Sequence, residues 1–129
     1  MYTIYPQLGS GVFEVRLDGG NLQLFAQYTA DRGNSGSLLL ASDGNFWVAE
    51  YDNGTSGYGD IVRLSPWDGA LLGTPTDFTG TDAAGAYPAA LIQASDGTFW
   101  GVTQGRGKAP KGSFADGTVF SFNAGLPPR

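Results

Sequence analysis

One phrase occurs twice in this chain and constrains its fold more than any other feature. Ala-Ser-Asp-Gly begins at Ala41 and again at Ala94, 53 residues later, each time between an apolar run and an aromatic pair. This order predicts a β-hairpin, because Asp and Gly accommodate the backbone angles of tight turns. A repeat of this length is typical of supersecondary units that bury their apolar faces by stacking on copies of themselves.

Shorter strand-like segments extend the repeat. Apolar pairs at 12–13, 61–62 and 119–120 occupy the same place in three successive units, each after a glycine-rich turn. A unit of about 50 residues with four antiparallel strands has the size and content of a propeller blade. No segment has a sustained 3.6-residue apolar period, so we expect an all-β domain with almost no helix. The expected division is a partial blade at 1–36, a complete blade at 37–87 and a partial blade at 88–129.

The same residues resemble a known family. An apolar run, Ala-Ser-Asp-Gly, Asn or Thr, Phe and a second aromatic residue, followed by a glycine-rich loop and Gly-Thr-Val-Phe, resembles the GloVer tandem repeat of bacterial exported β-propeller-like proteins. It is more distantly similar to NHL-type blades. The best matches are residues 91–100 and 116–120, whereas the first unit lacks the Ala-Ser-Asp-Gly hairpin. The resemblance implies β-propeller-like blades, about two and a half per chain, and an extracellular or cell-surface location. It carries no catalytic motif.

Composition narrows the functional classes. The chain of 129 residues has no Cys and no His, which excludes thiolate nucleophiles, disulfides and every His-dependent triad. Its net charge of −5 gives no general attraction to nucleic acid or to an anionic membrane, so we expect neither as a partner. No apolar stretch is long enough to span a membrane, and the residues after Met1 lack the pattern of a signal peptide.

The number of strands raises a question of assembly. Two and a half blades do not close a ring, since propellers use about 4–8 blades. Open ends would leave sheet edges exposed. We therefore expect a homo-oligomer that forms through blade edges, or a ring completed by missing repeats.

The acidic residues suggest structural roles, with a catalytic alternative. Asp43 and Asp96 share one repeat position, which favours a carboxylate that binds its own turn backbone, and no catalytic residue is expected. The alternative is a small glycan-active hydrolase that uses Glu50 with Asp43 or Asp96 as its two carboxylates. Thr103 stands where the next unit would place a second Glu50. Glu50 is therefore expected to be a solvated acid at a strand end.

No metal or other cofactor is expected, and calcium is the alternative. Asp52, Asn53 and Asp60 flank a glycine-rich loop that is rich in the hard oxygen ligands Ca²⁺ accepts. Their spacing fits no EF-hand loop.

Aromatic and basic residues supply the candidate ligand contacts. Trp67 stands in a turn without counterpart in the other units, whereas Trp47 and Trp100 follow a Phe in the repeated strand. Alternation should bury one member of each Phe-Trp pair. Arg106 and Lys108 could bind an acidic ligand, with a solvated surface loop as the simpler interpretation. The leading hypothesis is a non-catalytic binding or scaffold module with a glycan or a protein as ligand.

Overall fold

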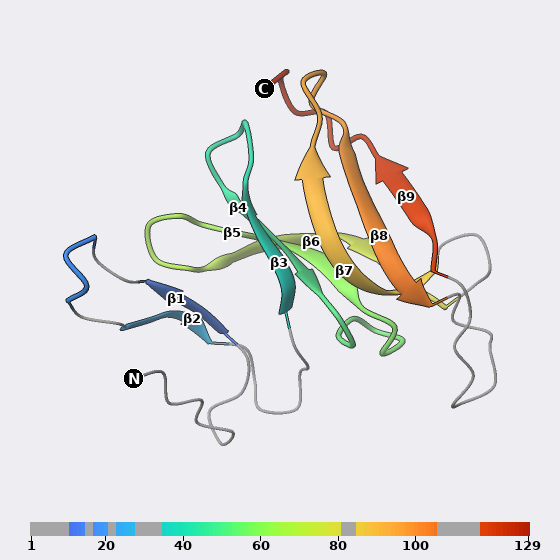
Figure 1. Cartoon of the computed structure of the whole chain (residues 1–129), viewed down its shortest axis with the longest axis horizontal. Helices are drawn as coiled ribbons and strands as arrows, with labels where there is room; N and C mark the ends of the chain where they lie inside the picture. Colours follow the sequence, from blue (N-terminus) through green and yellow to red (C-terminus); the bar gives the residue numbers. More distant parts are fainter. Residues whose placement is uncertain (1–10, 15–16, 21–22, 28–34, 81–84, 106–116) are drawn as a thin grey trace.

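The chain is a three-sheet β-structure. The computed structural model describes residues 11–14, 17–20, 23–27, 35–80, 85–105 and 117–129. These residues form nine β-strands and no helix, in three antiparallel sheets (Figure 1). The all-β expectation is confirmed. Of the partial blade expected at 1–36, residues 1–10, 15–16, 21–22 and 28–34 lie outside the described ranges.

Each sheet is a meander in which consecutive strands are neighbours. Sheet A contains β1 (Gly11–Glu14) and β2 (Gln23–Gln27). Sheet B contains β3 (Ser35–Leu40), β4 (Phe46–Glu50), β5 (Asp60–Leu64) and β6 (Leu71–Asp77). Sheet C contains β7 (Ala86–Gln93), β8 (Phe99–Gly105) and β9 (Val119–Phe122).

The two copies of the repeated phrase form the same turn. In sheet B the Ala41 N–H donates to the Asn45 carbonyl at 3.0 Å, and in sheet C the Ala94 N–H donates to the Thr98 carbonyl at 2.8 Å. Each turn also has a glycine at positive φ, which in sheet C is Gly97 at +90°. A side chain at that position would be strained, so Gly is the residue that this turn requires.

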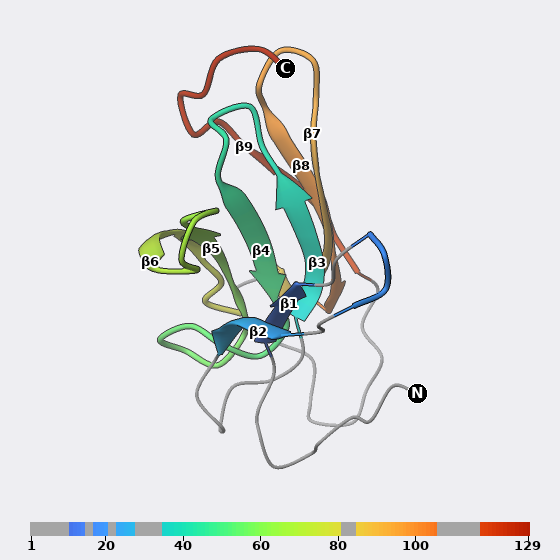
Figure 2. The ribbon, with the colours of Figure 1, turned by 90° about the vertical axis from the view of Figure 1, so that its left-hand side faces the viewer.

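The sheets are stacked face to face in chain order, with sheet B between sheets A and C (Figures 1 and 2). Between sheets A and B, Phe25 packs edge-on against Phe46 with ring centroids 5.8 Å apart. Between sheets B and C, Trp47 stacks on Phe99 at 4.4 Å, and Phe99 stacks on Phe122 at 5.0 Å. At the same interface β7 runs against β3 and β4.

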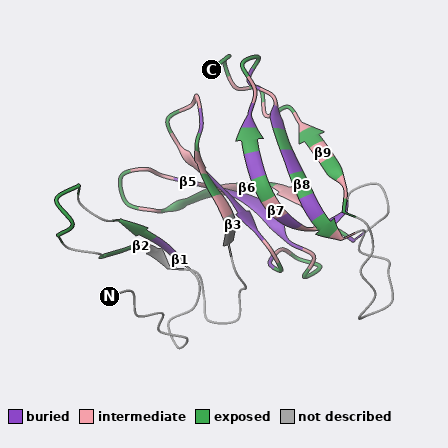
Figure 3. Ribbon diagram, in the orientation of Figure 1, coloured by how far each residue is buried: buried purple, intermediate pink, exposed green. Residues whose placement is uncertain are grey.

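This stacking explains which strands are buried on both faces. In β4 the four residues after Phe46 are all buried. Val48 lies in the core between sheets A and B, whereas Trp47 and Ala49 lie in the core between sheets B and C. In β8 buried Phe99, Gly101 and Thr103 alternate with exposed Trp100 and Val102 (Figure 3). Only one face of sheet C is therefore covered by the described residues.

Candidate functional site

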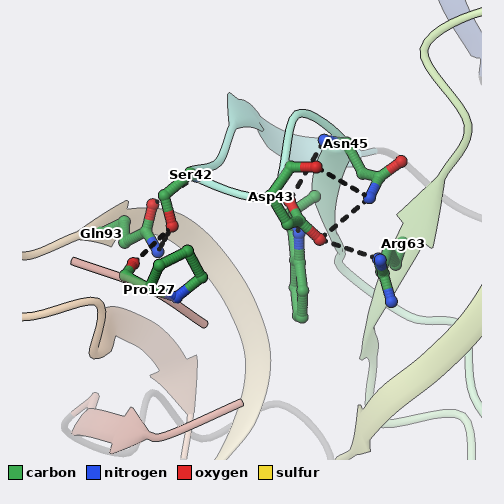
Figure 4. Close-up of polar contacts among 7 residues, drawn as sticks. Ser42, Asp43, Asn45, Arg63, Gln93 and Pro127 are labelled. Carbon is green, nitrogen blue, oxygen red and sulfur yellow. Dashed lines mark hydrogen bonds and ion pairs between the residues drawn. The ribbon is translucent and has the colours of Figure 1, made fainter. Parts of the chain in front are cut away.

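Asp43 is held by several donors at the end of the β3–β4 hairpin (Figure 4). Its carboxylate accepts hydrogen bonds from the Asn45 backbone N–H at 3.1 Å, the Asn45 amide Nδ2 at 2.9 Å and the Trp47 indole Nε1 at 3.2 Å. Arg63 Nε forms an ion pair with Asp43 Oδ2 at 2.9 Å, and its guanidinium lies 6.0 Å from the centroid of the Trp47 ring. The carboxylate thus fastens the turn, the core tryptophan and β5 together.

These contacts set the pKa of Asp43 below its ordinary value. Partial burial is the largest single influence and raises the pKa, but hydrogen bonds from Asn45 and Trp47 and the charge of Arg63 together outweigh it. The pKa of the exposed Asp96 is also lowered, by hydrogen bonds from Thr98, whose backbone N–H donates at 2.9 Å. Both carboxylates are ionised acceptors within their own turns.

A second polar cluster joins the two hairpins. The Ser42 N–H donates to Gln93 Oε1 at 2.8 Å, and Gln93 Nε2 donates to Ser42 Oγ at 2.9 Å. The Ser42 hydroxyl in turn donates to the Pro127 carbonyl at 2.7 Å (Figure 4). Our reading of the sequence missed Gln93. Its signal is the break it makes in the apolar run, because Leu40 is the matching residue of sheet B.

Glu50 lies at the opposite end of β4 and is not solvated. The expectation of a solvated acid is wrong, since only 2% of Glu50 is exposed. Its Oε2 accepts a hydrogen bond from Asn53 Nδ2, whereas Oε1 is buried without a partner. Asp60 stands opposite Glu50 in β5, and Asp77 stands opposite Asp60 in β6.

The residues suggested for a calcium site, Asp52, Asn53 and Asp60, do not all lie in the same environment. Asn53 and Asp60 are buried near one another in the structure of this loop, but Asp52 is exposed. In the part of the chain that the structure describes, no group of three or more Asp, Glu, His or Cys side chains is arranged to hold a metal ion. Asp77 is instead used by the loop, because its Oδ2 accepts hydrogen bonds from the Thr55 backbone N–H and hydroxyl.

The three tryptophans occupy three different environments. Trp47 is buried in the core and cannot stack on a ligand from solvent. Trp67 is 89% exposed in the β5–β6 turn. Trp100 is 44% exposed on sheet C, although it stands at the repeat position of Trp47. Arg106 and Lys108 lie outside the described residues.

The face of sheet C that points away from sheet B is apolar. We call it the outer face of sheet C. Register places two pairs side by side on it, Ile92 with Trp100 and Val102 with Val119. Their exposed fractions are 62%, 44%, 43% and 71% in that order. Monomeric proteins rarely leave such a continuous apolar surface without a use for it.

Sheet B contains the same arrangement in a covered state. Leu39 pairs with Trp47 and Ala49 pairs with Ile61, and all four belong to or pack against the core between sheets B and C. The first three stand 53 residues before Ile92, Trp100 and Val102. Ile61 stands 58 residues before Val119, so the loops absorb the difference. In sheet B, Trp47, Ala49 and Ile61 are buried and Leu39 is partly buried, because the Leu91 and Phe99 face of sheet C packs against them.

Sheet A has an exposed apolar face of its own. Phe13 pairs with Leu24, and both point away from sheet B, with 57% and 43% of their surfaces exposed. Their neighbours Val12 and Phe25 belong to the core between sheets A and B. We call the Phe13–Leu24 pair the outer face of sheet A.

Comparison with protein-family models, curated proteins and solved structures finds no match. The described residues also contain no helix long and apolar enough to cross a membrane. What the outer face of sheet C could bind is therefore indicated by the chain itself, because sheet B shows what packs against the matching face.

Proposed function

We propose that this protein is a non-catalytic scaffold module of propeller-blade-like sheets, which binds another protein through the outer face of sheet C. The blade interpretation is supported by the four-strand meander of sheet B and by the face-to-face stacking of three sheets in chain order. The relationship to GloVer repeats and an extracellular location remain part of the proposal. They rest on the repeated hairpin phrase.

The observation that carries the proposal is the exposure of Trp100 at a position where its counterpart Trp47 is buried. Complete burial of an apolar side chain contributes about 1.5–3 kcal/mol, and the four side chains of the outer face are about half exposed. Covering the face would therefore contribute about 4 kcal/mol before the cost of association. A second β-sheet with large apolar residues is the partner that this surface fits best.

The hydrolase alternative is not favoured by the geometry. Asp43 and Glu50 flank opposite ends of β4, whose five residues alone span about 13 Å. Glycosidase carboxylates are about 5–9.5 Å apart, and both must reach the sugar. Asp96 lies in the β7–β8 hairpin, which is at the same end of the sheets as the β3–β4 hairpin that carries Asp43 (Figure 1). Glu50 is at the other end of β4.

A glycan site at Trp67 is also less well supported. Sugar recognition needs polar groups held beside the ring, but the polar residues of this turn bind its own backbone. Ser65 Oγ accepts a hydrogen bond from the Trp67 N–H at 3.3 Å, and Asp68 Oδ1 accepts one from the Ala70 N–H at 3.1 Å. Trp67 is therefore a reference residue for a test of the scaffold role.

Hydroxyl-radical footprinting tests the proposal, with Trp67 as internal standard. Oxidation of Trp100 and Trp67 would be compared between the purified, diluted protein and the protein kept in extracts of the cells that make it. If the outer face of sheet C is covered in its natural assembly, the ratio of Trp100 to Trp67 oxidation falls several-fold there. An equal ratio in both preparations would refute the scaffold role.

A further inference from the structure

We infer that the outer face of sheet C binds the outer face of sheet A of a second copy of this chain. The inference rests on the proposed function, because it names the partner of the same face. It commits to a head-to-tail contact between two different surfaces.

The direction of stacking inside the chain is the first argument. Sheet B has one face toward sheet A, which precedes it in the chain, and one toward sheet C, which follows it. We call a face that points toward the start of this stack a preceding face, and one that points toward its end a following face. Val12 of sheet A packs against the face of sheet B that carries Val48 and Val62, and Trp47 on the other face of sheet B packs against Phe99 of sheet C. Both internal contacts thus join a following face to a preceding face, and never two faces of the same kind.

The residues of the two free faces follow this rule. The outer face of sheet C is a following face, because Val119 stands at the repeat position of Ile61, which packs toward sheet C. The outer face of sheet A is a preceding face, because Phe13 stands at the repeat position of Phe120. Phe120 points back to sheet B, where its ring lies 5.1 Å from that of Phe78. No described sheet packs against either outer face. Leu38 and Leu40 are also exposed, at the β3 edge of the face of sheet B on which Val12 and Phe25 of sheet A pack, so sheet A already occupies part of that face.

The two free faces cannot meet within one chain. Sheet B lies between sheets A and C, and the inner faces of both are occupied by their contacts with it (Figure 1). A contact between outer faces therefore requires two molecules. Because the two surfaces differ, each added copy presents both again, so the contact generates a closed ring or an open filament.

Two charge substitutions test this contact. Val119→Lys disables the outer face of sheet C, and Phe13→Lys disables that of sheet A. Both side chains are more than half exposed, so neither change disturbs the fold of the single chain. Trp67→Lys is the control, because it removes an exposed aromatic ring from a turn that belongs to neither face. Light scattering behind size exclusion measures the mass of each protein over a range of concentrations.

The wild type and Trp67→Lys should associate as concentration rises, whereas each face variant should need roughly tenfold or more protein to do so. A 1:1 mixture of the two face variants should form dimers and nothing larger. In that mixture the intact sheet C face of Phe13→Lys meets the intact sheet A face of Val119→Lys. The chain has no cysteine of its own, so each variant carries one thiol. With oxidised glutathione added as the oxidant, a mixture of Phe13→Cys and Val119→Cys should form a mixed disulfide between the two proteins faster than either variant alone forms its homodimer.

Other outcomes would overturn the inference. If Phe13→Lys associates like the wild type while Val119→Lys does not, the sheet C face binds something other than sheet A, and the scaffold role stands. If the wild type stays monomeric at every concentration, or both variants associate unchanged, the head-to-tail contact is wrong. The Trp100 footprint then decides separately whether the face is covered by a different protein.

Discussion

Replacing Asp43 by Asn should destabilise the protein far more than the same change at Asp96. The Asn oxygen can still accept from the Asn45 N–H and from Trp47 Nε1, but its amide nitrogen would face two other donors, Asn45 Nδ2 and Arg63 Nε. Leaving buried donors without an acceptor costs about 1–3 kcal/mol. The ion pair adds less than about 1 kcal/mol, because Arg63 is 37% exposed.

The assay is urea unfolding at neutral pH, followed by far-ultraviolet circular dichroism and by tryptophan emission. With an m-value of about 2 kcal/mol/M, a loss of about 1–3 kcal/mol lowers the midpoint by roughly 0.5–1.5 M urea. Asp96→Asn is the matched control: Asp96 occupies the same repeat position, is exposed and accepts from Thr98 alone. Its midpoint should hardly change. Equal losses in the two variants would refute the reasoning, because they would show that the turn alone, and not the contacts to Trp47 and Arg63, determines the cost.

Two further predictions use the same part of the molecule. The pKa values of Asp43, Asp68 and Asp96 are lowered in the folded state, below the value of 3.8 that these groups have when unfolded. The stability that these carboxylates contribute is therefore complete above pH 3.8 and is lost as the pH falls through their lower folded pKa values. The unfolding free energy measured from pH 5 downward should therefore decline, with a smaller decline in Asp43→Asn, and a pH-independent curve would contradict this assignment. Gln93→Leu places at this position the residue that sheet B has at the matching position, Leu40. It should lower the free energy of unfolding by about 1–3 kcal/mol, because the Ser42 N–H loses its acceptor. Thermal unfolding measures this loss, and unchanged stability would show that water replaces the amide.

The repeat in the sequence predicts the strands and turns because their causes are local. Both Ala-Ser-Asp-Gly hairpins form, and the apolar pair at 61–62 lies within β5 as expected. The position of Glu50 could not be predicted in this way. Its burial depends on how the rest of the chain packs around the end of β4, where Asn53 of the following loop donates a hydrogen bond to it. The matching Thr103 instead pairs its hydroxyl with that of Thr118 at 2.6 Å in sheet C.

The ion pair between Asp43 and Arg63 could not be predicted from the sequence either, because it depends on the register between strands. Arg63 reaches Asp43 because β5 places it directly opposite Trp47, whose indole binds the same carboxylate. In sheet C the residue opposite Trp100 is Ser121, so Asp96 has no equivalent cation. A repeat that looks uniform in sequence thus produces one fastened hairpin and one exposed hairpin.

The difference between Trp47 and Trp100 connects fold to function. Both follow a Phe after the same turn, and both lie on the face of their sheet that points toward the C-terminal end of the stack. Local sequence therefore gives the two side chains the same orientation. Trp47 is buried because sheet C packs against it, whereas no described sheet packs against Trp100, which is exposed. Burial of an apolar side chain gives the same free energy in a protein core as in an interface between proteins. The uncovered face of sheet C therefore has the composition of an interface. The internal contact between sheets B and C is the template for what this face binds, namely a face that points back along the stack. The face of sheet A that carries Phe13 and Leu24 points in that direction, and no described sheet packs against it.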